Sequence, residues 1–315
     1  MPRSRIPEPI VDLLLVAVAA VWGASFLVAK ALTEEVGAAS TLALRFLAAV
    51  VGLAVLCVVR RERLPHGRGL AIAAALGCTQ ALVIGLETWG VHLTSATNAG
   101  LLISLALVCT PVLESVASRS WLPRTYFVAA VAAVVGVAML VSDGGLRTPT
   151  VGDLLVIVAA IVRAVHVTAS ARLTRTRSDS TLGVVMVQLV VCAVASCAIA
   201  GAPLVDAAAS LSPRGWASVA FLGLLCSVFA FVVQLWAVRR TSATRASILM
   251  GTEPVWALAA GVALGGESLA LVGLAGAALI VAASYAGQAI ERRHRLAQDA
   301  RARGEAREPS VPSLP

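Results

Sequence analysis

The sequence predicts an all-α membrane protein with ten transmembrane helices, arranged as two inverted five-helix repeats. Three observations predict this fold: the composition, a series of long apolar runs and the distribution of arginine. Hydrophobic residues make up 59% of the 315 residues, charged residues make up 13%, and the mean hydropathy is +0.89. A soluble domain averages about 45–50% apolar and about 25% charged residues. A globular core of this length cannot bury so much apolar surface, so the bilayer must be its solvent.

Apolar runs of about 18–24 residues recur along the chain, and each can cross ~30 Å of hydrocarbon as a helix. We expect spans near residues 12–32, 38–59, 69–91, 96–117, 125–142, 152–171, 181–200, 215–238, 244–264 and 268–288. The expected domains are a cytoplasmic N-terminus (1–11), a first repeat (12–142), a second repeat (152–288) and a disordered basic tail (289–315). The first apolar run is too long for the core of a signal peptide, and we expect it to remain as the first helix.

The basic residues alternate with the predicted spans. If the N-terminus is cytoplasmic, twenty basic residues fall on inner segments and only Arg147 and Arg214 fall on outer ones. The other three, Lys30, Arg45 and Arg163, lie within spans. This pattern satisfies the positive-inside rule and predicts a bacterial inner-membrane protein with both termini in the cytoplasm. The net charge of +8 therefore reflects topology, and no nucleic-acid partner is expected, because phosphate binding needs a folded basic face.

The two halves of the chain contain related segments. Asp12-Leu-Leu-Leu-Val matches Asp153-Leu-Leu-Val-Ile at an offset of 141 residues, and Thr94-Ser-Ala-Thr matches Thr241-Ser-Ala-Thr at an offset of 147. The second register also sets Glu87 against Gln234. Because five helices per half is an odd number, the second half must enter the membrane from the opposite side. Inverted repeats of this kind are typical of secondary transporters, with the substrate site near the midplane between the halves. Chance similarity between apolar segments is the alternative.

A series of short motifs runs from about residue 11 to residue 288. In order they are Trp22-Gly-Ala-Ser-Phe26 with Lys30, Leu44-Arg45-Phe46, Thr94-Ser-Ala-Thr-Asn98, Gly152-Asp153, Arg239-Arg240-Thr-Ser-Ala-Thr-Arg245-Ala-Ser247, Glu253-Pro254 and Gly266-Glu267. Their order and spacing resemble the EamA-type branch of the drug/metabolite transporter superfamily. The resemblance implies two five-helix repeats and a transporter, usually an exporter, of amino acids, nucleobases, other metabolites or drugs. The chain departs from the family at Leu107, where proline is common, and at Arg163, where tryptophan is common.

Arg163 and Glu253 are the strongest candidates for a substrate site. Each lies about ten residues, or roughly 15 Å, into its span, so opposite charges share one depth. Charges in hydrocarbon cost at least ~2.5–3.5 kcal/mol, which makes an intramembrane ionisable group a functional hypothesis by default. We expect both side chains to face the cavity, with Arg163 binding a substrate carboxylate as a fork and Glu253 carrying a proton or meeting an amine. A static ion pair is the alternative. Pro254 either opens the ninth helix locally or kinks it.

Further polar side chains are predicted to line the same cavity. His166 follows Arg163 on nearly the same helix face and can titrate near neutral pH, although a hydrogen-bonded packing histidine is the alternative. The other cavity candidates are Gln80, Trp22 and Ser25. The candidates for coupling or for structural charge pairs are Glu87, Lys30 and Arg45, with Glu87 expected to pair with Lys30 or Arg45.

These features favour a secondary transporter of a small molecule, and we expect it to export an amino acid or a related metabolite. A receptor or scaffold without transport activity and an intramembrane enzyme are the alternatives. No cofactor and no metal are expected, because none of the six cysteines forms a Cys-x-x-Cys pair and no His-Glu-x-x-His or Gly-x-Ser-x-Gly motif occurs. The absence of a Walker A motif argues against ATP as the direct driver within this chain and leaves proton coupling as one option, and glycines near residue 276 permit a homodimer.

Overall fold

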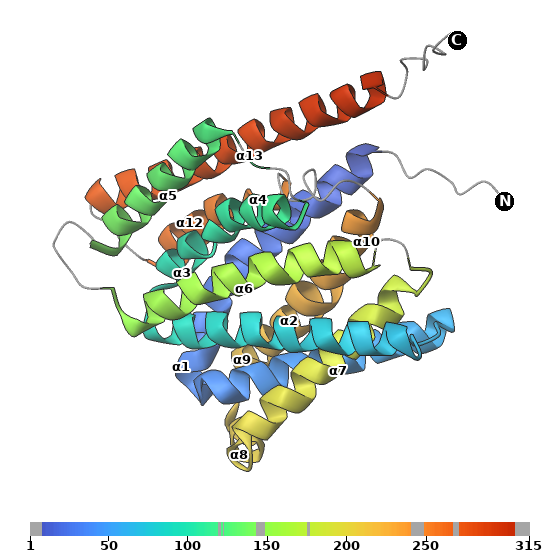
Figure 1. Ribbon diagram of the computed structural model, residues 1–315. Coiled ribbons are helices and arrows are strands. Elements are labelled where there is room, and N and C mark those ends of the chain that lie inside the picture. Colours follow the sequence, from blue (N-terminus) through green and yellow to red (C-terminus); the bar gives the residue numbers. More distant parts are fainter. Residues whose placement is uncertain are drawn as a thin grey trace, which may run out of the picture.

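The computed structural model describes residues 8–118, 121, 123–142, 149–174, 177–240, 249–266 and 271–305, and every regular element in these ranges is helical (Figure 1). The helices are α1 (Glu8–Arg60), α2 (Arg68–Leu93), α3 (Ala96–Leu102), α4 (Leu105–Ser118), α5 (Arg124–Ser142), α6 (Val151–Thr174), α7 (Thr181–Ala200), α8 (Pro203–Ser210), α9 (Pro213–Ala220), the π-helix η1 (Phe221–Phe229), α10 (Ala230–Arg240), α12 (Glu253–Ala263) and α13 (Leu271–Glu305).

Several helices have the length and apolarity of membrane spans. Five stretches of the described chain qualify fully: Ile10–Arg60, Arg68–Leu93, Val151–Thr174, Thr181–Ala200 and Pro213–Arg239. Two shorter apolar helices are Arg124–Gly136 and Leu271–Gly287. The all-helical membrane class predicted from composition is therefore confirmed, whereas the count of ten helices and the inverted relation of the halves stay predictions.

The first two predicted spans form one helical run that bends at Gly37. Gly37 has φ 76° and ψ 162°, and no other residue of α1 has a non-helical backbone. A positive φ is readily adopted by glycine, which lets the chain reverse without a loop. In Figure 1 the two arms of α1, residues 8–36 and 38–60, diverge from this bend. The gap between the predicted spans, residues 33–37, is therefore not a loop, because residues up to 36 continue the helix.

Two predicted spans are broken in their middle. The span 96–117 is interrupted between α3 and α4 at Ile103 and Ser104, and the span 244–264 is interrupted by a turn at Gly251 and Thr252, just before α12. At each break a hydroxyl donates to the carbonyl three residues earlier: Ser104 Oγ to Leu101 O at 2.6 Å, and Thr252 Oγ1 to Leu249 O at 2.9 Å. Neither span is therefore one continuous α-helix in the described residues. Residues 241–248, which include the Thr241 motif, lie outside the described residues.

The C-terminal segment is helical where disorder was expected. Helix α13 continues from the last predicted span to Glu305, so the prediction of a disordered tail was wrong for residues 289–305. The segment Glu291–Glu305 is rich in Arg, Ala, Gln, Leu and Glu, which are strong helix formers, and the first proline follows only at Pro309. The rest of the tail, 306–315, lies outside the described residues.

Asp153 joins the start of α6 to the end of α2. Its Oδ2 accepts from the Thr150 backbone N at 3.0 Å and from Thr150 Oγ1 at 2.7 Å, while its own backbone N donates to Thr150 Oγ1 at 3.1 Å. This reciprocal arrangement is a capping box. The second oxygen, Oδ1, accepts from Thr94 Oγ1 at 2.7 Å, and Asp153 is only 2% exposed. One carboxylate therefore caps α6 and fastens it to the Thr94 motif of the other half.

We expect Asp153→Ala to lower the free energy of unfolding by about 1–3 kcal/mol, because it removes a helix cap and leaves the Thr94 hydroxyl without its acceptor. The measurement is the thermal stability of the purified protein in detergent. Asp153→Asn is the matched control, since it keeps an acceptor oxygen and should lose less stability. Equal melting of Asp153→Ala and the wild type would contradict this role.

Glu35 lies at the bend of α1, outside the two predicted spans that flank it. Its Oε1 accepts from the backbone N of Ser212, the N-cap residue of α9, at 2.7 Å. The hydrogen bonds from Ser212 lower the pKa of the Glu35 carboxyl below its usual value, in agreement with a carboxylate placed at a positive helix terminus. Because the folded-state pKa is lowered, this contact stabilises the fold above the ordinary pKa and is lost as the pH falls through the lowered one.

We therefore expect Glu35→Gln to melt below the wild type at pH 7, and the difference to disappear as the pH falls below the lowered pKa of Glu35. Melting temperatures between pH 7 and pH 3 give the test. Asp206→Asn, at an exposed carboxylate on α8, is the matched control. A gap between Glu35→Gln and wild type that stays constant with pH would contradict the assignment.

Candidate functional site

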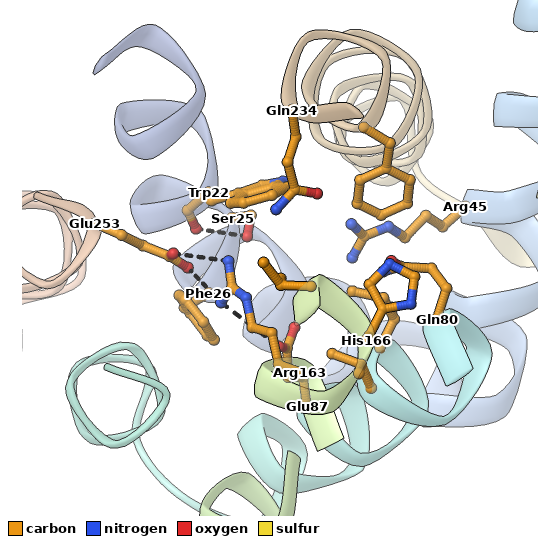
Figure 2. A pocket seen from close by; sticks show the side chains of 14 residues that line it. Trp22, Ser25, Phe26, Arg45, Gln80, Glu87, Arg163, His166, Gln234 and Glu253 are labelled. Carbon is orange, nitrogen blue, oxygen red and sulfur yellow. Dashed lines mark hydrogen bonds and ion pairs between the residues drawn. The ribbon is translucent and has the colours of Figure 1, made fainter. Parts of the chain in front are cut away.

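A small polar chamber lies between α1, α2, α6, α10 and α12 (Figure 2). Its lining includes predicted residues and some that were not predicted. Eight of the nine predicted residues line it; only Lys30 does not. They are Trp22, Ser25, Arg45, Gln80, Glu87, Arg163, His166 and Glu253. The space inside that water can occupy is about 20 Å³, which holds only about one water molecule. The chamber is therefore too small for a metabolite in this conformation.

Arg163 and Glu253 form a bidentate ion pair across the chamber. Arg163 Nη1 lies 3.1 Å from Glu253 Oε1, and Arg163 Nη2 lies 2.9 Å from Oε2. Their side chains are 15% and 9% exposed, so water screens the pair little. The Arg163 guanidinium also lies 4.7 Å from the Trp22 ring centroid, and the Trp22 Nε1 donates to the Cys226 carbonyl at 2.9 Å. An aromatic face beneath a cation adds a further attraction and fixes the guanidinium plane.

The backbone at Glu253 explains how the carboxylate reaches the chamber. Glu253 is the first residue of α12, and Pro254 occupies the first turn of that helix. Proline is tolerated there because its missing N–H would have had no intrahelical acceptor. Pro254 therefore lies at the start of a helix that follows the break at Thr252. Of the two alternatives from the sequence, a local opening or a kink, the structure does not contain a kink in the middle of a continuous helix.

Glu87 pairs with Arg163 and not with Lys30 or Arg45, which corrects the prediction. Glu87 Oε1 lies 3.8 Å from Arg163 Nη1, too far for a hydrogen bond, and this buried oxygen has no donor among the described residues. Arg163 thus lies between two carboxylates, with Glu253 held closely and Glu87 held loosely.

Lys30, on α1, contacts the C-terminal end of α2. Its Nζ donates to the His92 carbonyl at 2.9 Å and lies 3.6 Å from Glu34 Oε1. A lysine near the C-terminus of α2 meets the negative end of that helix, which is favourable. His92 is five residues beyond Glu87, and this distance along α2 explains why Lys30 does not pair with Glu87.

His166 is held by two hydroxyl groups. Its Nδ1 lies 2.7 Å from Thr79 Oγ1, and its Nε2 lies 3.4 Å from Ser170 Oγ. Thr79 Oγ1 donates to the Leu76 carbonyl at 2.9 Å, so it accepts a hydrogen bond from His166 Nδ1–H. These contacts favour the neutral imidazole with its proton on Nδ1. His166 is 6% exposed and Gln80 is 5% exposed, and both side chains line the chamber.

Arg45 reaches the chamber from the second arm of α1 and is held by the π-helix η1. Arg45 Nε donates to Ser227 Oγ at 2.9 Å, and Ser227 Oγ donates in turn to the carbonyl of Leu222, five residues earlier, at 2.9 Å. Gly223 allows this approach, because a Cβ there would lie 2.9 Å from the Arg45 carbonyl oxygen. π-Helices are rare and occur frequently at functional sites.

The sequence analysis missed several residues of the chamber. Gln234 and Phe231 line it, and Ser227 orients Arg45. The repeat register predicted from the sequence sets Glu87 against Gln234, and both side chains line the chamber, so this register contained a signal for Gln234. Nothing in the sequence marked Ser227, because a π-helix depends on contacts across the fold.

Comparisons with known proteins agree with this architecture. The sequence profile of the EamA-like transporter family matches residues 9–142 and 150–286. The chain is 27% identical over 262 residues to the uncharacterized inner membrane transporter YedA of Escherichia coli strain K12, covering 82% of this chain and 84% of that protein. YedA of Escherichia coli O157:H7 matches equally. A solved crystal structure with 17% sequence identity superimposes with a TM-score of 0.64, over 91% of this chain and 99% of the other, which indicates a shared fold.

Proposed function

The chain belongs to the EamA-like transporter family, and from this premise we propose that it is a secondary exporter of a small zwitterionic or anionic metabolite, such as an amino acid or a related compound. Membership of this family and the similarity to an inner membrane transporter make it a multi-pass membrane transporter. The substrate class, the outward direction and the cytoplasmic position of both termini are our proposal. The arginines on alternate loops support that orientation.

The proposed architecture is ten helices in two inverted repeats, 12–142 and 152–288. Its support is the pair of helix breaks at 103–104 and 251–252, which fall within a residue of one another in the 147-residue register. Discontinuous helices at corresponding positions of two halves are the usual pointer to the binding site of a secondary transporter. Glu253 stands immediately after the second break, at the start of α12.

The observation that carries the proposal is the set of four charged side chains in the chamber. Arg45 and Glu87 come from the first half of the chain, and Arg163 and Glu253 come from the second. Buried charges are costly in a membrane and are retained where they bind substrates or relay protons. Because the two halves share the charges, separating the halves must break the Arg163–Glu87 pair, and this couples occupancy of the chamber to its opening.

Proton coupling is part of the proposal, with Glu87 as the proton carrier. Glu87 Oε1 has no hydrogen-bond donor among the described residues and lies 3.8 Å from the cation that Glu253 already holds. A carboxylate in this position can take up a proton or a substrate amine without breaking the closer pair. Transport needs no covalent step, and none is proposed.

The test is a comparison of extracellular metabolites between cells that overexpress the chain and cells that carry the empty vector. We expect at least one small compound with a carboxylate group to be enriched outside the overexpressing cells. Cells that express Arg68→Ala, at an exposed arginine far along α2 from Glu87, serve as the matched control and should show the same enrichment. Equal profiles for overexpressing and empty-vector cells across growth conditions would overturn the export proposal.

A further inference from the structure

Arg45 differs from Arg163, the other cation of the chamber, because its two Nη atoms bind no carboxylate of the described residues. Arg163 uses both Nη atoms on Glu253. Arg45 makes one hydrogen bond, from Nε to Ser227, and its Nη1 and Nη2 have no hydrogen-bond acceptor within the described residues. Arg45 is nevertheless only 5% exposed. A buried guanidinium with free donors is costly unless an acceptor joins it.

The position of the Arg45 guanidinium is built by its surroundings. Ser227 Oγ accepts from Nε, and the hydrogen bond that the same hydroxyl donates to the Leu222 carbonyl holds Ser227 in place. With Nε held at the wall, the two Nη atoms are the part of the group left for the chamber. The polar side chains of Gln80, His166 and Gln234 lie around it (Figure 2). The two amides add hydrogen-bond donors beside the guanidinium.

The charges of the chamber are also unevenly placed. Arg163 lies between Glu253 and Glu87, at 2.9 Å and 3.8 Å, so that two carboxylates share one cation. Arg45 has no ion-pair partner within 4.0 Å in the described part of the chain. A substrate carboxylate that bound Arg163 would have to displace Glu253 from its ion pair. One that bound Arg45 would displace no ion-pair partner. Arginine binds carboxylates through two parallel N–H bonds, and this is the geometry that the free Nη pair offers.

We propose that Arg45, assisted by Gln80 and Gln234, forms an anion subsite that binds the carboxylate group of the transported metabolite. This assigns to Arg45 the role that the sequence suggested for Arg163. The identity of the anion as part of a substrate rests on the proposed transport function. The subsite itself is a property of the purified protein and is testable without transport.

The experiment uses formate, the smallest carboxylate, on the purified full-length protein in detergent. The ¹³C-formate resonance is recorded at constant ionic strength, and unlabelled formate is added as the competitor. We expect saturable line broadening with the wild type, a loss of affinity of about tenfold or more in Arg45→Gln, and a smaller loss in Arg45→Lys, which keeps the charge but not the fork. Arg68→Gln, at an exposed arginine, should bind formate as the wild type does.

Two results overturn the subsite. One is a wild type that shows no saturable broadening. The other is an Arg45→Gln protein with wild-type affinity for formate. If Arg45→Gln is not recovered folded, Ser227→Ala and Arg45→Lys decide, and wild-type affinity in both overturns the proposal. Formate binding that depends on Arg45 in a chain that enriches no metabolite outside the cell would overturn the export function alone. Export without any formate binding would overturn the subsite alone.

Discussion

Cells that express Arg163→Ala are expected to lose export, and the purified variant is expected to melt well below the wild type. The substitution leaves Glu253 and Glu87 buried at 9% and 14% side-chain exposure without their common cation. Removing one partner of a buried ion pair costs about 3–5 kcal/mol, because the remaining charge is uncompensated. The measurements are the extracellular metabolite profile and the thermal stability in detergent, with Arg68→Ala as the control at an exposed arginine.

A double variant separates a transport role of this pair from a purely structural one. In Arg163→Gln with Glu253→Gln both charges are removed together, and replacing a whole buried pair is often neutral for stability. Glu87 still lacks its cation in this variant, so we expect it to recover part of the melting temperature lost in Arg163→Ala but none of the export. Recovery of both properties would show that the bidentate pair is a static connection between α6 and α12, and it would contradict a role in alternating the chamber.

The class of the fold and the depth of the charges were accessible from the sequence. Composition alone requires a membrane environment, and counting residues from the span ends put Arg163 and Glu253 at one depth. Depth is a one-dimensional property, so a linear sequence contains it. The partner of Glu87 depends on which faces of α2 and α6 meet, and this cannot be counted along the chain; the prediction of Lys30 or Arg45 was wrong for that reason.

The helix breaks and the π-helix were not accessible in the same way. Proline is the usual signal of a break, yet Pro111 lies inside α4, and the interruption falls at Ile103 and Ser104. The hydroxyl of Ser104 bonds back to a carbonyl at that break, but the hydroxyls of Ser25 and Thr79 make the same bond within unbroken helices, so such a residue does not mark a break. Ser227 in the π-helix bonds to Arg45, which comes from another helix. Local sequence cannot encode a contact whose second partner is 182 residues away.

Replacing Gly23 is expected to lower both stability and export, for a steric reason. A Cβ at Gly23 would lie 2.5 Å from Trp256 Cβ, 2.7 Å from the Ala257 backbone N and 2.8 Å from the Glu253 carbonyl oxygen. Two of these atoms are backbone of α12 and cannot rotate away. Gly23→Ala therefore pushes α12, and with it Glu253, away from α1. We expect a loss of about 1–3 kcal/mol of stability from overpacking and a loss of export from the displaced carboxylate.

Gly85→Ala is the matched control, because it is the same substitution in another membrane helix. A Cβ at Gly85 would meet nothing within 4 Å, so no helix has to move. Alanine is a better helix former than glycine by up to about 1 kcal/mol, and Gly85→Ala should melt at or above the wild-type temperature and export normally. Thermal stability and extracellular metabolites are measured for both variants. A Gly23→Ala protein that behaves like Gly85→Ala would mean that α12 tolerates displacement from α1, and the close contact would then play no part in positioning Glu253.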